Sequence, residues 1–167
     1  MTGGGGFILS ALVHALVEAG NRPRVLDNFL TGRRENLADF LDRIDLIEGD
    51  VRDPAVAARA RQGIAFVLRQ AAIPSVPRSL QDPVSSNEAN LSGTLSILVA
   101  ARDARVRRLV YAGSSSAYGN TPGQPRVKMM PTTPVSPYAV SKLAGELRPR
   151  PAMVPIAYPL AAASISW

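Results

Sequence analysis

Tyr138 and Lys142 are four residues apart and follow Ser136-Pro137, a pair typical of a helix start because Ser caps the first turn and Pro fits its first position. Residues at this spacing share one face of a helix, so the phenol and the ammonium would be neighbours. A nearby cation stabilises a phenolate and lowers the pKa of a tyrosine from about 10 towards the range of a general base. The pair therefore indicates proton transfer, with an ordinary exposed pair as the alternative.

Three consecutive serines, Ser114, Ser115 and Ser116, follow a predicted strand over Arg107–Ala112. In open sheets of parallel strands, ligands bind beyond the carboxyl ends of the strands. The serine hydroxyls are therefore expected where the Tyr138 pair would act, although a polar exit from a strand is the simpler explanation.

Gly3–Gly6 come directly before a helical pattern that starts at Phe7. Glycines at such a start let the backbone approach a pyrophosphate, whose charge is met by free N–H groups and the helix dipole. Asp27 ends the next predicted strand, at the spacing where an acid meets the ribose hydroxyls of adenosine. The two features together predict a dinucleotide site, whereas the glycines alone would also fit a flexible N-terminus.

The elements that must position these residues alternate between helix and strand along the chain. Strands are predicted over Pro23–Asp27, Ile44–Gly49, Ile64–Leu68 and Arg107–Ala112, and helices over Phe7–Val17, Ala55–Gln62, Asn87–Ala104 and from Pro137. Strands separated by helices pair in parallel, so we expect an open α/β sheet. The stretch from Gly119 to Pro137, with five prolines, is predicted to be a loop.

The composition fits one soluble domain, because the 167 residues are 46% hydrophobic and 19% charged. The absence of cysteine excludes disulfides and thiolate chemistry and makes the cytoplasm the default location. The net charge is +6, but aromatic residues are only 5%, which argues against a nucleic-acid surface. Neither apolar stretch, Phe7–Val17 or Met153–Trp167, has the features of a signal peptide or membrane span, and His14 has no metal-ligand companions.

Taken in order, the motifs resemble those of extended short-chain dehydrogenases/reductases, the NAD-dependent epimerase/dehydratase family. They are Thr2–Ile8, Leu26–Asn28, Glu48–Val51, Gln70–Ala72, Asn90, Ser114–Ser116 with Tyr118-Gly119, and Tyr138–Lys142. The resemblance covers about Thr2 to Glu146, and Ser75–Ser79 looks like the UDP-glucose or UDP-N-acetylglucosamine 4-epimerase branch. It implies a doubly wound parallel sheet of the Rossmann type.

The resemblance also implies roles for individual residues. Tyr138 would be the base, Lys142 its partner and a nicotinamide-ribose ligand, and Ser114 the hydrogen-bond partner of the sugar hydroxyl, with Ser115 and Ser116 as remaining candidates. The cofactor NAD would be held by Gly3, Gly6, Phe7, Ile8, Asp27, Asn28, Asp50, Val51, Ala71, Ala72, Asn90, Tyr138 and Lys142.

The implied activity is 4-epimerisation of a nucleotide sugar by reversible hydride transfer at C4. Sugar 4,6-dehydratases of the family carry an Asp-Glu pair just after the catalytic Ser or Thr, and here those places are Ser115 and Ser116. The expected substrate is a UDP-sugar, without a nucleic-acid or membrane partner, and a homodimer is the assembly left open.

The sequence departs from the family in four places. Leu9 replaces the third glycine, which should push the first helix off its strand, and Arg69 puts a large cation where the family often has histidine. The first strand should be nearly missing, and the substrate domain should be absent. We therefore expect an NAD-binding domain over 1–146 and a proline-rich tail, unlike the family, over 147–167.

Two alternatives follow from these departures. The first is a non-catalytic NAD-binding remnant of a frameshifted or mis-called gene, in which case upstream DNA should encode a Val/Ile-rich strand and another downstream frame should resume the family sequence. The second is a basic partner-binding domain that uses Arg102–Arg108. Cations at the end of a helix also simply complement its dipole.

Overall fold

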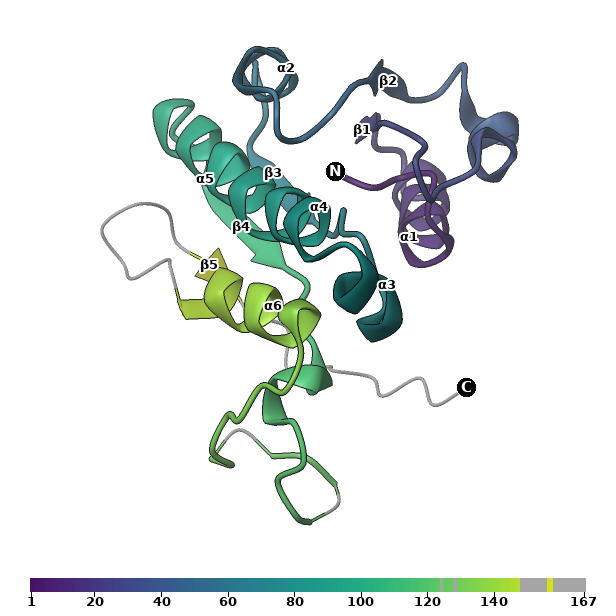
Figure 1. Cartoon of the computed structure of the whole chain (residues 1–167). Helices are drawn as coiled ribbons and strands as arrows, with labels where there is room; N and C mark the ends of the chain where they lie inside the picture. Colours follow the sequence, from purple (N-terminus) through teal and green to yellow (C-terminus); the bar gives the residue numbers. More distant parts are fainter. Residues whose placement is uncertain (124, 128, 148–155, 158–167) are drawn as a thin grey trace.

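The structure is a computed structural model that describes residues 1–123, 125–127, 129–147 and 156–157. Its strands are β1 (Arg24–Asp27), β2 (Asp45–Glu48), β3 (Phe66–Arg69), β4 (Arg108–Tyr111) and β5 (Ile156–Ala157). Its α-helices are α1 (Phe7–Glu18), α2 (Pro54–Ala60), α3 (Val76–Gln81), α4 (Pro83–Asn87), α5 (Gly93–Asp103) and α6 (Pro137–Leu147). Two 3-10 helices, η1 (Arg34–Phe40) and η3 (Ser115–Tyr118), and a π-helix, η2 (Glu88–Ser92), complete the described elements. The predicted alternation of helix and parallel strand is confirmed (Figure 1).

The sheet consists of two parallel strips that meet at a single residue. One strip pairs β1 with β2, and the other runs β3, β4, β5. Thr2 makes parallel bridges to Leu26 of β1 and to Arg69 of β3, so it occupies the position between the strips. Its N–H donates to Leu68 O at 2.9 Å, while Gly3 N–H donates to Leu26 O at 2.8 Å.

Thr2 alone thus bridges the two strips at the centre of the sheet. The sequence led us to expect a first strand that is nearly missing, and a single bridging residue fits this expectation. A small groove of about 30 Å³, open to solvent, lies beside Met1 and Thr2. Its walls come from both strips and from the helices α2 and α5 above them, including Leu26, Val67 and Ile97.

Helices cover both faces of the sheet, because successive strand residues point to opposite sides. Val25 of β1 faces α1 and η1 and packs with Val13 and Leu37. Leu26, the next residue, packs on the other face, in the core formed mainly with α2 and α5 (Figure 1). Leu9 is buried in α1, and the helix packs with Val25 of β1 through Val13, so Leu9 does not push the helix off this strand.

The two predicted helix starts have the local chemistry expected of them. Asp53 accepts from the N–H groups of Ala55 and Val56 at the start of α2, and Ser136 Oγ accepts from Ala139 N–H at the start of α6. The helix predicted over 87–104 is interrupted by η2, and α3 and α4 were not predicted. Of the expected tail over 147–167, only Leu147 and β5 are described, and β5 pairs with β4; the other residues lie outside the described part.

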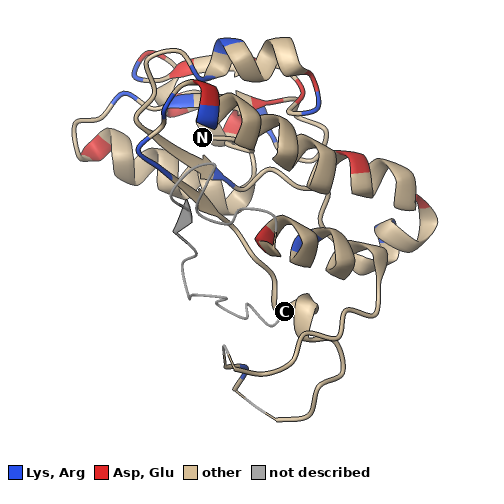
Figure 2. Cartoon of the chain, turned by 90° about the vertical axis from the view of Figure 1, so that its left-hand side faces the viewer, with Lys and Arg blue, Asp and Glu red and all other residues tan. Residues whose placement is uncertain are grey.

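Acidic and basic positions are interspersed along the ribbon (Figure 2). In the arginine cluster considered above, Arg102 pairs with Asp103 at 2.8 Å, and Asp103 also accepts from Arg61 at 3.2 Å. No helix within the described ranges is both long and apolar enough to span a membrane.

Candidate cofactor and catalytic site

The glycine loop brings the start of α1 against the segment that follows β3. Gly3 has a φ of +89°, and a Cβ there would lie 2.8 Å from the Ala71 Cα, so only glycine fits without a backbone shift. Gly6 caps α1 without a side-chain hydrogen bond, which leaves the N–H groups of the first turn without a capping acceptor. Phe7 and Ile8, in that turn, are exposed. This end of α1 is therefore open to an anionic ligand.

Asp27 connects the end of β1 to the glycine loop. Its Oδ2 accepts from Gly5 N–H at 2.8 Å, and its Oδ1 accepts from Phe29 N–H at 2.7 Å. The side chain is buried within the loop. Because a carboxylate has about four acceptor positions, two remain beyond these backbone bonds.

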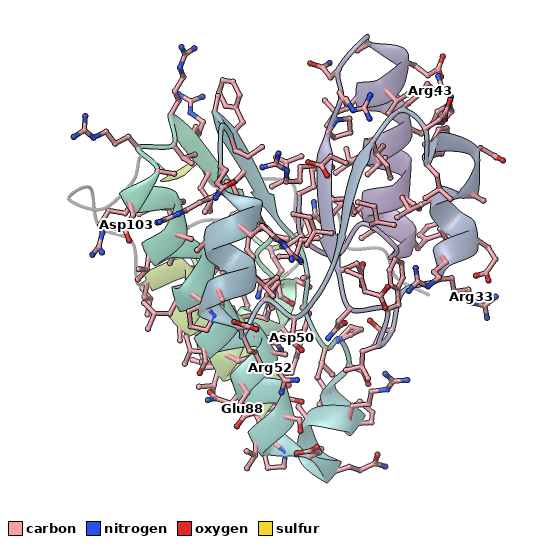
Figure 3. All side chains as sticks on the ribbon, turned by 90° about the horizontal axis from the view of Figure 1, so that it is seen from above. Arg33, Arg43, Asp50, Arg52, Glu88 and Asp103 are labelled. Atoms are coloured by element: carbon pink, nitrogen blue, oxygen red, sulfur yellow. The ribbon has the colours of Figure 1, made fainter. Side chains whose placement is uncertain are left out.

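A chain of polar contacts extends from Asn28 across the ends of β1 and β2. Asn28 Nδ2 donates to Asp50 at 2.8 Å, Arg52 pairs with Asp50 at 2.8 Å, and Arg52 also reaches Glu88 at 3.1 Å. Figure 3 shows Arg52 between the two carboxylates. The hydrogen bond from Arg52 lowers the pKa of Asp50 to about 2, against the opposing effect of partial burial. Asp50 is therefore an anion at neutral pH.

Two expected cofactor residues point into the protein. Val51 is buried in the core with α5, and a Cβ on Gly93 would come within 2.7 Å of its side chain. Asn90 is also buried; its amide accepts from Ile73 N–H at 2.8 Å and donates to Ser141 Oγ at 3.2 Å. Both side chains are therefore part of the interior, whereas Ala71 and Ala72 are half-buried in the segment that follows β3.

The helix α6 carries Tyr138 and Lys142 one turn apart. Tyr138 is half-buried and Lys142 is buried. The Lys142 ammonium lies 4.7 Å from the centre of the Tyr111 ring, and the Tyr111 hydroxyl donates to Lys142 O at 3.3 Å. A Cβ on Gly145 would lie 2.3 Å from that hydroxyl, so glycine is what allows α6 to approach β4 this closely.

Ser114 lies between β4 and α6. Its N–H donates to Glu146 Oε1 at 3.3 Å, and its Oγ accepts from Ser116 N–H at 3.2 Å, which caps η3. Burial raises the pKa of Glu146. The bond to Glu146 holds the serine run beside α6, so Ser114, Tyr138 and Lys142 belong to one packed unit at the carboxyl end of the sheet.

Arg69 is the cation expected at a strand end, and the structure buries it at the end of β3. It is 1% exposed, and its guanidinium donates to the carbonyl oxygens of Ala71 and Ala89. Sequence reasoning also missed Tyr111, Glu146 and Arg52 as neighbours of the expected site residues. Arg52 follows Asp50 closely enough to suggest their contact, but the other two contacts join residues more than thirty positions apart.

Residues 1–148 match the model of the NAD dependent epimerase/dehydratase family. The chain belongs to this family. It is 39% identical over 153 residues to the UDP-glucose 4-epimerase of Mycolicibacterium smegmatis, an alignment that covers 88% of this chain and 48% of the relative. The chain thus spans about half the length of the curated relatives that it matches.

Solved structures of the family share the Rossmann-type fold of this chain. The UDP-glucose 4-epimerase of Thermus thermophilus in complex with NAD is 40% identical, with a TM-score of 0.80, over 87% of this chain and 47% of that one. The dTDP-glucose 4,6-dehydratase of Streptomyces venezuelae, with NAD and TYD bound, is 34% identical, with a TM-score of 0.83, over 87% and 48%. Both epimerase and dehydratase chemistry thus occur among its structural neighbours.

Proposed function

We propose that the chain is an NAD-dependent nucleotide-sugar 4-epimerase that acts on a UDP-sugar. The observation that carries this proposal is that the open first turn of α1 and the Tyr138–Lys142 turn of α6 lie at the carboxyl edge of the same sheet. The Asp27–Gly5 bond places the first beside β1, and the Ser114–Glu146 bond places the second beside β4. This edge is where ligands bind in doubly wound sheets.

The residues around α1 fit a dinucleotide. The groove at Gly3 has no room for a Cβ, and the uncapped N–H groups of Phe7 and Ile8 can receive the pyrophosphate. Asp27 would accept the ribose hydroxyls, with Asn28 and Asp50 beside the adenosine and Ala71 and Ala72 along the groove. Bound NAD would supply the hydride acceptor and donor for the reaction.

On the catalytic side, Tyr138 would take the proton from the sugar 4-hydroxyl and later return one. Ser114 would hold that hydroxyl by a hydrogen bond, and its backbone bond to Glu146 keeps it beside α6. Lys142 would bind the nicotinamide ribose and stabilise the phenolate. Its ammonium lies over the Tyr111 ring, which restricts the orientations of the side chain.

The residues next to Ser114 favour epimerisation over dehydration. Elimination of water needs a further acid and base, and Ser115 and Ser116 supply neither a carboxylic acid nor a carboxylate. Epimerisation needs one base, because the same hydride leaves and returns at C4.

Two measurements on the purified chain test the proposal. Calorimetric titration with NAD should show saturable binding that Gly3→Val abolishes, with Val140→Ala, at an exposed position of α6, as a control. NMR should then show UDP-glucose converting to UDP-galactose. Binding without conversion would leave NAD binding alone as the function, and no binding would refute the proposal. A homodimer and a cytoplasmic location remain predictions.

A further inference from the structure

Arg69, at the end of β3, is the largest fully buried side chain in the described part of the chain. Its guanidinium donates to Ala71 O and to Ala89 O, the latter at 2.9 Å, while its Nε has no hydrogen-bond partner among the described residues. No carboxylate in these ranges forms an ion pair with it. Burying such a charge is costly, and the proposed catalytic roles make no use of it.

The two carbonyls that Arg69 binds belong to different segments. Ala71 follows β3 and packs beside Gly3, whereas Ala89 lies in η2. The next residue of η2, Asn90, accepts from Ile73 N–H and donates to Ile73 O. Arg69 and Asn90 therefore fix the segment 71–73, the edge of the proposed cofactor groove, to η2.

Arg69 also lies next to the environment of Lys142. Its cross-strand partner in β4 is Tyr111, and the Lys142 ammonium lies over the ring of this tyrosine. Burial, followed by the positive charge of Arg69, lowers the pKa of Lys142 to about 7, while Glu146 on the same helix acts in the opposite direction. Of the charged groups in the described ranges, Arg69 and Glu146 are those that act on Lys142.

We infer that Arg69 is a positioning residue of the site: it fixes the backbone of 71–73 beside Gly3, and it lies as a second buried cation on the strand residue paired with Tyr111, the residue that contacts Lys142. The inference rests on the proposed function, because only that function makes the segment 71–73 and Lys142 parts of one site. Lys142 would then exchange a proton near neutral pH, where the other cation of the pair, Arg69, stays protonated.

The chain has only two lysines, Lys128 and Lys142, so ¹³C-lysine NMR gives two signals that Lys142→Arg assigns. In the unaltered chain the Lys142 signal should titrate with a midpoint about three pH units below the ordinary lysine value of 10.5. Arg69→Gln keeps hydrogen-bond donors but removes the charge, and it should raise the Lys142 midpoint towards the ordinary lysine value. Arg61→Gln is the control. Like Arg69, Arg61 donates to a backbone carbonyl, but it forms an ion pair with Asp103, so its replacement should leave the Lys142 midpoint unchanged.

Amide hydrogen exchange tests the second action. Ala71 and Ile73 N–H groups, bonded to Thr2 O and Asn90, should exchange about tenfold faster in Arg69→Met, while Leu46 in β2 should not change. Equal titration of the two lysines in the unaltered chain would overturn the inference even if no variant folds. So would an unchanged Lys142 midpoint in a folded Arg69→Gln protein. Lysine titration and amide exchange are both measured without NAD or substrate. A failure of the proposed function would instead appear in the NAD titration, so the two failures can be told apart.

Discussion

The ammonium of Lys142 lies 4.7 Å from the centre of the Tyr111 ring, and the Tyr111 hydroxyl donates to the backbone of the same lysine. The aromatic residue at the end of β4 thus binds both the side chain and the main chain of α6 at the position that the proposed mechanism needs. A cation–π contact offsets part of the cost of burying the ammonium, but the lowered pKa shows that burial still prevails.

The buried Lys142 should make the free energy of unfolding increase with pH between about 7 and 10.5. Its pKa is about 7 in the folded chain and near 10.5 when unfolded, so between these values the unfolded chain binds more protons and stability rises with pH. Lys142→Met keeps an apolar stem against Tyr111 but cannot be protonated. We expect it to be more stable than the unaltered chain at pH 7, by a few kcal/mol at most, and to lose most of the rise between pH 7 and 10 in urea titrations.

The matched control is Lys128→Met, the same change at the other lysine, which should keep the pH-dependent rise. An unchanged slope in Lys142→Met would show that the lysine is protonated normally in the folded chain.

Asp50 should also make stability rise with pH, but on the acid side of the profile. Its pKa is lowered to about 2, so its contribution is complete above pH 4 and is lost as the pH falls towards 2. Asp50→Asn should reduce stability at pH 7 by about 1–2 kcal/mol and flatten the acid side of the stability profile. Arg52→Met should cost a similar amount, and the double variant little more, because both changes break one pair. Additive losses would contradict the coupling.

The order of the main elements followed from the sequence, because apolar periodicity and Asp-Pro or Ser-Pro starts are local signals. β1 and β4 begin and end within a residue of the predicted strands, and α6 begins at Pro137 as expected. The segment from Val76 to Ser92 shows what such signals miss. There, two short helices that begin near prolines run into a π turn, whose place depends on contacts with α6.

Sequence alone predicts the positions of candidate site residues that depend on local backbone conformation. It does not predict positions that depend on packing between residues far apart in the chain. Gly3 and Asp27 could be placed because a tight turn and a strand end have characteristic residues. The burial of Arg69 could not, since alternation along a four-residue strand does not say which carbonyls its end will meet. The bond between Ser114 and Glu146 likewise depends on how α6 docks on β4.

Asp27 should make the chain prefer NAD to NADP, because a carboxylate accepts bonds from a free 2′-hydroxyl and repels a 2′-phosphate. Arg34, which could favour the phosphate, is instead engaged by Glu48 and by the ring of Phe29. In calorimetric titrations NAD should bind about tenfold or more tightly than NADP. Asp27→Asn, which keeps an acceptor for a backbone N–H, should weaken NAD binding and reduce this preference, whereas Arg33→Ala should not.

Asp27→Ala also frees the N–H groups of Gly5 and Phe29, so it should weaken NAD binding further than Asp27→Asn. Equal or tighter binding of NADP by the unaltered chain would contradict the assignment.

The last prediction separates the roles of Tyr138 and Ser114, for the chain or for a longer form of it that shows epimerase activity. Tyr138→Phe deletes the proposed base but keeps the ring, so it should abolish nearly all turnover, with kcat reduced about 10²–10⁴-fold, while NAD affinity stays the same. Ser114→Ala removes one hydrogen bond to the reacting hydroxyl and should cost less, about 10–10²-fold. The variant keeps the backbone N–H that donates to Glu146, so the docking of α6 should persist. Val140→Ala, at an exposed position of the same helix, is the control and should leave both kcat and NAD affinity unchanged. Near-normal turnover of Tyr138→Phe would show that another group takes the proton, and a larger loss in Ser114→Ala than in Tyr138→Phe would reverse the two assignments.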